Sequence, residues 1–238
     1  MESDTLPSSD LPFVHETSFG KWFLGTDIWE IHVLRRALED LNRLMPDRER
    51  SYPVVADVGC GWGASFKLLK EDFAPERIVG VDVCGEMIAA ARQEAGRLDV
   101  PVDLYKADCA DLPLADESVD MVFCHQSFHH LVEQEKALGE FRRVLKPGGL
   151  LLFAESTRAY IHSWIIKLLF RHPMDVQRDA DEYVAMVRNA GFKVDDAAIS
   201  YPYLWWSRPD IGIFEQFFGA KPAKGHAETL INLVAVRP

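Results

Sequence analysis

Five short apolar runs alternate with stretches of helical character, and this alternation constrains the fold more than any other feature of the chain. The runs are "VVADV", "RIVGVD", "VDLYKA", "VDMVFCH" and "LLLFAE", all between residues 54 and 155. Each run has the length of a strand, and the stretches between them suit helices. Strands of continuous apolar character that alternate with helices are typical of a parallel sheet covered on both faces. The sequence therefore predicts a doubly wound α/β fold, with a ligand site at the carboxyl ends of its strands.

The segments on either side of this core are less regular. Apolar residues recur at helical spacing before position 46, in "AYIHSWIIKLLF", and in "DADEYVAMVRNAGF", where Asp179 or Asp181 begins the helix. "KVDDAAIS" and the C-terminal "NLVAVRP" are read as further strands. We therefore expect a disordered tail over 1–12 and a single domain over 13–238. Its parts are an N-terminal helical cap (13–50), a cofactor-binding core (51–155), a lid with strand six (156–230) and strand seven (231–238).

Charge and composition exclude several classes of function. The 238 residues carry a formal net charge of -11, which repels a phosphate backbone, so we expect no nucleic-acid partner. The N-terminus lacks a signal-peptide pattern, and no apolar run approaches the roughly 20 residues that cross a bilayer. The 4 cysteines have no CxxC or Cys/His ligand spacing, so we expect reduced thiols, no metal and a cytoplasmic protein without stable membrane insertion.

The loop "DVGCGWG", residues 57–63, predicts a nucleotide-like ligand. Gly59, Gly61 and Gly63 follow a strand directly and open a helix, so a ligand can approach the backbone closely. Asp82 ends the next strand, where a carboxylate accepts hydrogen bonds from ribose hydroxyls in both NAD and S-adenosylmethionine sites. Asp57 would repel a pyrophosphate but balance an ammonium or a sulfonium, and Asp108 can accept from an adenine amino group. These two carboxylates favour S-adenosylmethionine.

At this point the chain resembles a known family. Residues 52–155 are similar to class I S-adenosylmethionine-dependent methyltransferases, above all to the small-molecule group that includes the ubiquinone and menaquinone enzymes. The matching stretches are "VVADVGCGWG", "IVGVDVCGEMIAAAR", "ADCADLPLADESVDMVFCHQSFHHL" and "EFRRVLKPGGLLLFAE". "NLVAVRP" resembles the seventh strand, which pairs antiparallel with the sixth in this family. The resemblance implies a Rossmann-like, doubly wound seven-stranded sheet, mostly parallel, with one antiparallel strand.

The resemblance also implies roles for individual residues. S-adenosylmethionine, with S-adenosylhomocysteine as the product, would be held by Asp57, Gly59, Cys60, Gly61, Gly63, Asp82, Val83, Met87, Asp108, Cys109 and His125. The methyl group would pass to a small, fairly apolar or aromatic acceptor by direct in-line displacement without metal. Alignment of acceptor, methyl and sulfur supplies about 7–11 kcal/mol without a dedicated base. The sequence leaves the oligomeric state open, with a homodimer as one possibility.

His129 and His130 in "HQSFHHL" are the best candidates for a catalytic base. The simpler interpretation is that they cap the next helix and line the cleft. Aromatic residues before and after the core suit the acceptor side of the site, with Trp22, Trp62, Tyr203 and Trp206 as the candidates. These rings can equally serve to join a cap to the core.

Three alternatives stay open at this level. The first is a protein methyltransferase. The second is a non-catalytic cofactor-binding module that regulates a partner, with "LWWSRPDIGIFEQFF" as its docking surface. The third is an NAD enzyme, which would be favoured only if NAD bound and S-adenosylmethionine did not. The four cysteines, which all fall at or just past strand ends, would also suit arsenite methylation. Cysteines at cofactor-facing positions are more simply read as small residues packed against a ligand.

Overall fold

The computed structural model describes Thr17, Gly20, Trp22, Thr26 and residues 29–45, 51–202 and 227–238. The expected tail over 1–12 lies outside these residues, and so do Tyr203 and Trp206. The domain boundaries expected within 13–50 and 156–230 are therefore only partly covered by the description. Within it, no helix has both the length and the apolar character that a membrane crossing needs.

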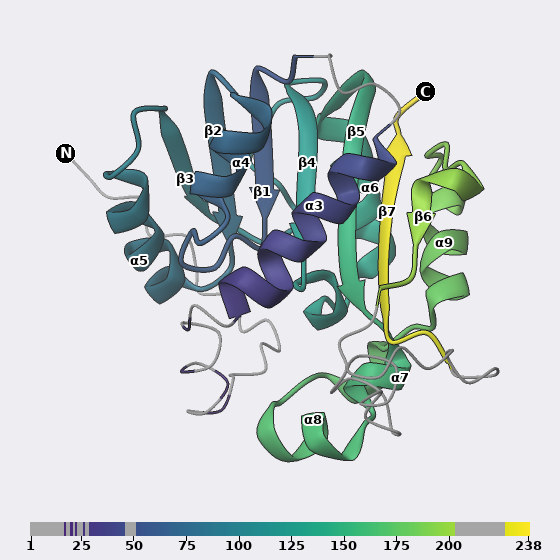
Figure 1. Cartoon of the computed structure of the whole chain (residues 1–238). Coiled ribbons are helices and arrows are strands. Elements are labelled where there is room, and N and C mark those ends of the chain that lie inside the picture. The colour runs from purple at the N-terminus through teal and green to yellow at the C-terminus, as the bar shows by residue number, and fades with distance from the viewer. Residues whose placement is uncertain are drawn as a thin grey trace.

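The described strands form one seven-stranded sheet in the order β3-β2-β1-β4-β5-β7-β6 (Figure 1). Neighbours from β3 to β5 are parallel, and β7 runs antiparallel to both β5 and β6. The expected fold class, a doubly wound and mostly parallel sheet with an antiparallel strand, is confirmed. The strands are β1 (Val54–Val58), β2 (Arg77–Asp82), β3 (Val102–Lys106), β4 (Val119–His125), β5 (Leu145–Ser156), β6 (Ile199–Ser200) and β7 (Leu230–Val236).

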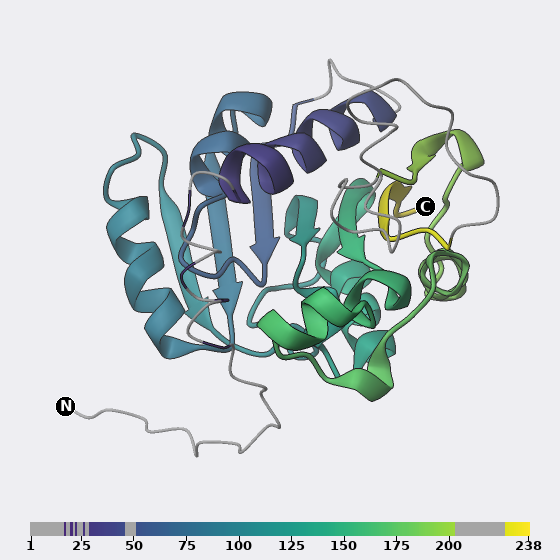
Figure 2. The ribbon, with the colours of Figure 1, turned by 60° about the horizontal axis from the view of Figure 1, so that its bottom comes forward.

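Helices cover both faces of this sheet, and the side chains of each strand alternate between the two layers. Along β5, Leu150 and Leu152 pack beneath one set of helices, and Leu151 and Phe153 beneath the other. The first set is α3 (Arg35–Leu44), α4 (Phe66–Phe73) and α5 (Gly85–Ala95), and the second is α6 (Gln134–Val144) and α9 (Ala180–Asn189). The short π-helix η1 (Glu30–Leu34) leads into α3 (Figures 1 and 2). Burial on both faces explains why the parallel strands read as unbroken apolar runs.

Two segments differ from what their sequence pattern predicts. The stretch 159–170 is not one helix with an apolar stripe, because it divides into α7 (Arg158–Ile161) and α8 (Trp164–Leu169). The hydroxyl of Ser163 accepts a hydrogen bond from the backbone of Ile166 at 3.4 Å and so starts a new helix. Trp164 and Leu168 are consequently exposed, with 69% and 71% of their surface accessible.

The strand predicted over 193–200 is also shorter than expected, with β6 at Ile199–Ser200 and an isolated bridge at Lys193. By contrast, α9 begins as predicted. Asp179 and Glu182 form a reciprocal capping box at its first turn. Local signals thus set the first residue of α9, whereas the number of residues that pair in β6 depends on the position of this strand at the edge of the sheet.

The carboxyl ends of β1, β2, β3 and β4 meet at one edge of the sheet (Figure 2). The segment with α7 and α8 lies beyond the same end of β5 (Figure 1). The strand ends and the loops that follow them therefore bring together residues that are far apart in the chain.

Candidate functional site

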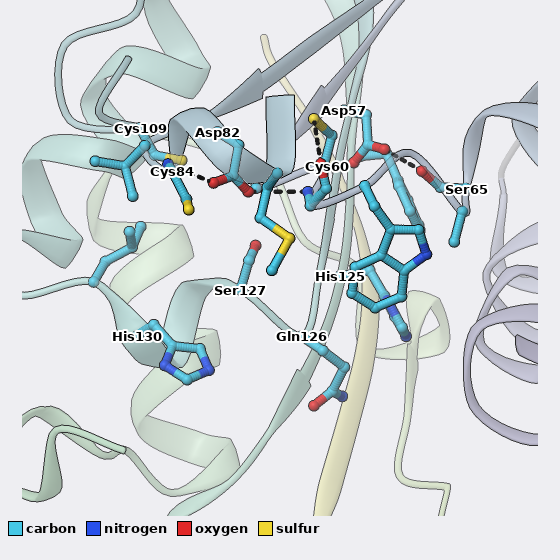
Figure 3. Close-up of a pocket in the computed structure, with 18 of the residues that line it drawn as sticks. Asp57, Cys60, Ser65, Asp82, Cys84, Cys109, His125, Gln126, Ser127 and His130 are labelled. Atoms are coloured by element: carbon cyan, nitrogen blue, oxygen red, sulfur yellow. Dashed lines mark hydrogen bonds between the residues drawn. The ribbon is translucent and has the colours of Figure 1, made fainter. Parts of the chain in front are cut away.

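A cavity of about 260 Å³ lies at the carboxyl ends of β1, β2, β3 and β4. Apart from Gly63, every residue that the sequence assigned to the cofactor lines this cavity. Figure 3 shows carboxylates and cysteines of the first three strand ends on one side, with Gln126 and His130 across from them. The structure thus gathers the expected residues around one space.

The glycine loop that follows β1 leaves room for a ligand at one position and packs tightly at two others. Gly59, Gly61 and Gly63 all have positive φ, at 76°, 54° and 85°. A Cβ on Gly61 would meet nothing within 4 Å, so its backbone faces open space in the cavity. A Cβ on Gly59 would lie 2.4 Å from that of Ser127, and one on Gly63 would lie 2.5 Å from the ring of Phe66. Gly63, which was expected to contact the cofactor, instead packs the loop against α4.

Asp57 is a buried carboxylate at the end of β1. Its side chain is 2% exposed and accepts a hydrogen bond from the hydroxyl of Ser65. Burial raises the pKa of Asp57 to about 7; the Ser65 hydroxyl lowers it and the charge of Asp82 adds to the rise. A cation in the cavity would stabilise the ionised form, so the position suits a positively charged ligand group.

Asp82 and Asp108 follow the next two strands. Asp82 accepts from the backbone N–H of Gly61 at 2.9 Å and of Cys84 at 2.8 Å, which joins the glycine loop to the start of α5 (Figure 3). Burial raises the pKa of Asp82. Asp108 accepts from the backbone of Ala110 at 2.9 Å. Each carboxylate oxygen has two lone pairs, so both residues keep acceptor capacity for ligand hydroxyl or amino groups.

Aromatic rings form the wall at the end of β4. His125 lies between Phe123, whose ring stacks on it at 5.8 Å, and Trp29, which meets it edge-on at 5.6 Å. Trp62 packs against Trp29 with 5.7 Å between ring centroids. Burial, with a smaller effect from His129, lowers the pKa of His125 to about 3. Its Nε2 has no hydrogen-bond partner among the described residues, so a neutral imidazole with a vacant nitrogen borders the cavity.

Glu155, at the end of β5, fixes the turn that follows β4. One of its carboxylate oxygens accepts from the backbone of Ser127 at 2.9 Å and of Phe128 at 2.7 Å. The other lies 2.6 Å from Nδ1 of His129. The carboxylate is 0% exposed, so these contacts compensate for its burial. Sequence reasoning missed this residue, although an acidic residue that closes a buried strand is the same signal that identified Asp82.

The two histidines proposed as catalytic residues lie in different environments. His130 lines the cavity, whereas His129 does not; it is 3% exposed and turned toward Glu155. Burial, and to a lesser extent the neighbouring histidines, hold the pKa of His130 well below its usual range. His129 therefore shapes the turn, and only His130 faces the space that a ligand would fill.

The expected substrate residues divide in the same way. Trp62 lines the cavity, and Trp22 does not; its surface is 62% exposed. Tyr203 and Trp206 fall outside the described residues. Gln126 and Ser127 line the cavity without having been predicted, and so does Trp29, which belongs to the aromatic group before the core but was not among the chosen substrate residues. Trp29 is positioned by Thr26, whose carbonyl and hydroxyl oxygens accept from its backbone N–H, and no local pattern in the sequence shows that it reaches the site.

The cysteines do not form a thiolate site. Burial raises the pKa of Cys60, Cys109 and Cys124, with further increases from nearby carboxylates. Protonated thiols are poor ligands for soft ions. In the part of the chain that the structure describes, the one group of three metal-ligating side chains consists of histidines. The geometry therefore favours cysteines as small residues packed around a ligand.

Comparison with known proteins agrees with this geometry. Residues 56–153 match a family described as a methyltransferase domain. The demethylmenaquinone methyltransferase of Thermus thermophilus is 36% identical over 121 residues, which cover 51% of this chain and 52% of that enzyme. The malonyl-[acyl-carrier protein] O-methyltransferase of Methylovorus is 35% identical over 51% of this chain and 42% of that protein. The chain spans about half or less of the length of the curated relatives it matches.

A solved structure has the same fold. The complex of the Haloferax volcanii Trm112 methyltransferase activator with a methyltransferase superposes with a TM-score of 0.67 and 24% identity, over 92% of this chain and 96% of that one. At this identity the likeness concerns the fold.

Proposed function

We propose that this chain is a class I S-adenosylmethionine-dependent methyltransferase and that it transfers a methyl group to a small, fairly apolar or aromatic molecule. The match of residues 56–153 to a methyltransferase domain and the similarity to demethylmenaquinone methyltransferases support the proposal. The observation that carries the proposal is the carboxylate-lined cavity into which the backbone of Gly61 opens. S-adenosylmethionine bears a sulfonium and an ammonium, and buried carboxylates at the strand ends favour both charges.

Each part of the cofactor has a counterpart in the cavity wall. The methionine part lies along Gly59 and Gly61, with its ammonium toward Asp57. The ribose hydroxyls donate to the free lone pairs of Asp82, and the adenine amino group donates to Asp108. Val83 and Met87 flank the adenine. These assignments are supported by the shared cavity, and in the case of Asp57 by the raised pKa that a bound cation would lower.

Apolar residues in the cavity lining suit the acceptor. Trp29, Trp62, Leu131 and Val132 all line the cavity, and apolar surface excludes water and favours a hydrophobic or aromatic molecule. A lone pair of the acceptor atom attacks the methyl carbon in line with the carbon–sulfur bond. That bond breaks, its electron pair stays on sulfur, and S-adenosylhomocysteine leaves. The proton of the acceptor passes to solvent.

The structure also bears on the rival interpretations. A regulatory module would have its acceptor space filled by side chains, whereas this cavity extends from the carboxylates to the tryptophans. That space favours the enzyme. The four free cysteines support a cytoplasmic location, which cell fractionation can check.

The proposal is tested by incubating the purified chain with methyl-labelled S-adenosylmethionine and fractionated cell extract, followed by identification of the labelled product. We expect label in a small apolar molecule. Asp82→Ala should abolish transfer and weaken S-adenosylhomocysteine binding, with the exposed Asp111→Ala as control. Tight cofactor binding without any transfer would overturn the enzyme proposal. Unchanged cofactor affinity in Asp82→Ala would overturn the assignment of the site.

A further inference from the structure

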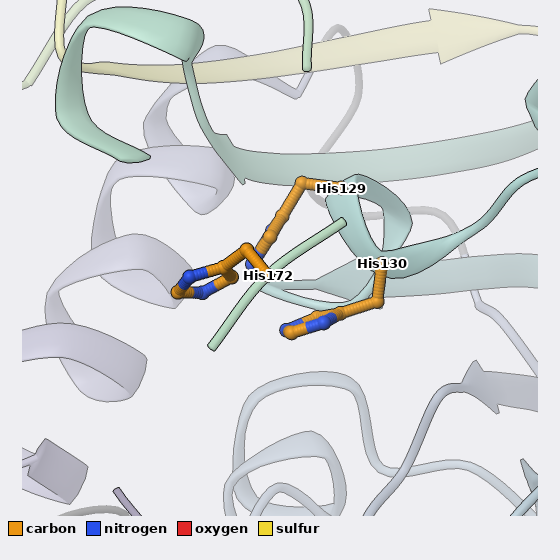
Figure 4. Close-up of side chains that lie close together, drawn as sticks. All are labelled: His129, His130 and His172. Atoms are coloured by element: carbon orange, nitrogen blue, oxygen red, sulfur yellow. The ribbon is translucent and has the colours of Figure 1, made fainter. Parts of the chain in front are cut away.

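Three imidazoles lie close together, and one of them, that of His130, lines the cavity. The sequence gives no sign that His172 joins the other two. His129 and His130 lie on the short helix η2 (Phe128–His130), and His172 comes from the segment before the helix η3 (Met174–Val176). One ligand nitrogen from each lies within 4.8 Å of the others (Figure 4). We propose that His129, His130 and His172 bind a divalent transition-metal ion of the Zn²⁺ type. The proposal departs from the expectation of no metal, which rested on ligand spacing along the chain.

Two buried glutamines hold the backbone of the segment that carries His172. Gln177 donates from Nε2 to the carbonyl oxygen of His129 at 2.9 Å and to that of Pro173 at 2.7 Å. Gln134 donates to the carbonyl of Val176 at 3.0 Å. Both glutamines are buried. The segment that carries His172 is therefore hydrogen-bonded to the turn that carries the other two imidazoles. These contacts hold the three histidines near one another before any ion binds.

Glu155 supplies the partner that metal-bound histidines usually have. Its carboxylate lies 2.6 Å from Nδ1 of His129 and is completely buried. A carboxylate that accepts from one ring nitrogen fixes the tautomer, and the second nitrogen then presents its lone pair to an ion. The same contact sets the orientation of the His129 ring, which lies 4.2 Å from that of His130 and 5.1 Å from that of His172.

The other two ligands of the proposed site are the imidazoles of His130 and His172, whose ring centroids lie 4.9 Å apart. Within the described residues, neither ring nitrogen of His130 or His172 takes part in a hydrogen bond, so their lone pairs are not already engaged.

Three neutral imidazoles suit Zn²⁺, which binds nitrogen at about 2.0–2.1 Å in a tetrahedral arrangement and tolerates an open fourth position. Tetrahedral ligands at that distance are about 3.4 Å apart, so nitrogens that lie within 4.8 Å of one another would draw together by at most about 1.4 Å on binding. Because His130 also lines the cavity, the fourth position would be within reach of an oxygen or sulfur atom of an acceptor.

The test is a Zn²⁺ titration of the purified full chain by competition with a chromophoric chelator, performed without S-adenosylmethionine. We expect one equivalent to bind. His172→Asn should weaken binding by at least about tenfold, the loss that even the partners of metal ligands cause when they are removed. His162→Asn, at an exposed histidine outside the cluster, is the matched control and should bind as the wild type does. Far-ultraviolet circular dichroism and urea unfolding report whether each variant is folded, and neither depends on cofactor binding.

X-ray absorption of the Zn²⁺-loaded wild type gives a readout that needs no variant. Three imidazole nitrogens and no sulfur would support the site. Sulfur ligands, no stoichiometric binding, or equal affinity in folded His172→Asn would overturn it and leave the three rings as side chains that pack against one another. Because the titration omits the cofactor, failure of methyl transfer has no bearing on this result.

Discussion

Replacing Asp57 with asparagine should stabilise the ligand-free protein at alkaline pH and at the same time abolish its hold on the cofactor. The carboxyl is 2% exposed, and the Ser65 hydroxyl is its one hydrogen-bond partner among the described residues. Burial is the main reason that the pKa of Asp57 rises from 3.8 to about 7. Asparagine preserves the shape and can still accept from Ser65, but it carries no charge.

The magnitude follows from the pKa. Each unit corresponds to about 1.4 kcal/mol, so ionising Asp57 costs about 4 kcal/mol more in the folded protein than in the unfolded chain. Between pH 3.8 and about 7 the folded state binds more protons than the unfolded state, so stability falls as the pH rises through this window. Asp57→Asn has no carboxyl to ionise at this position, so its unfolding free energy does not fall for this reason as the pH rises. Its advantage in unfolding free energy should therefore grow by about 2–3 kcal/mol between pH 5 and pH 8.

Urea unfolding of both proteins at several pH values, followed by tryptophan fluorescence, measures this change. The new amide N–H₂ can lose about 1–3 kcal/mol if it finds no partner, but that loss is the same at every pH. The slope of the difference against pH is therefore the decisive quantity. It corresponds to a relative rise in Tm of about 4–12 °C across the window. Asp111→Asn, at an exposed carboxylate, should leave the pH dependence unchanged.

Cofactor binding completes the test. Wild-type affinity for S-adenosylhomocysteine should increase as the pH rises through about 7, because the ligand ammonium favours the ionised form of Asp57. The variant should bind weakly at every pH. Parallel pH–stability curves for the two proteins would refute the argument that burial holds the proton on Asp57.

Two further substitutions test the loop and the acceptor wall. Gly59→Ala forces a side chain into positive φ and against Ser127, so it should destabilise the protein by at least about 2 kcal/mol in urea unfolding. Gly139→Ala, with open space around it in α6, should instead stabilise the protein by about 0.5–1 kcal/mol. Equal effects of the two substitutions would contradict the packing described for Gly59. Trp62→Ala removes the contact with Trp29 and should raise the KM for the acceptor more than that for S-adenosylmethionine in steady-state kinetics; a rise confined to the cofactor would place Trp62 at the methionine end instead.

Local signals were sufficient for most of the fold and for one half of the site. The period of the apolar runs predicted the parallel strands, and the glycines with the acidic residues at strand ends predicted Asp57, Asp82 and Asp108 as neighbours in one cavity. This works because the carboxyl ends of adjacent parallel strands always meet at one edge. The same reasoning failed for residues 159–170, where Ser163 interrupts a helical pattern by capping a second helix.

The sequence by itself determined the sheet, the glycine loop and the carboxylate wall, since each depends on spacing within a strand, a turn or a strand–helix unit. Only the tertiary structure decided the aromatic wall at the end of β4 and the cluster of His129, His130 and His172. Trp29 reaches His125 from a segment before the sheet, and Gln177 fastens the segment of His172 to the carbonyl of His129. Such contacts depend on the path of connections between distant elements, which no local period records. Trp62 illustrates both contributions within one loop. Its position follows from the glycines beside it in the sequence, whereas its contact with Trp29 follows from the tertiary fold.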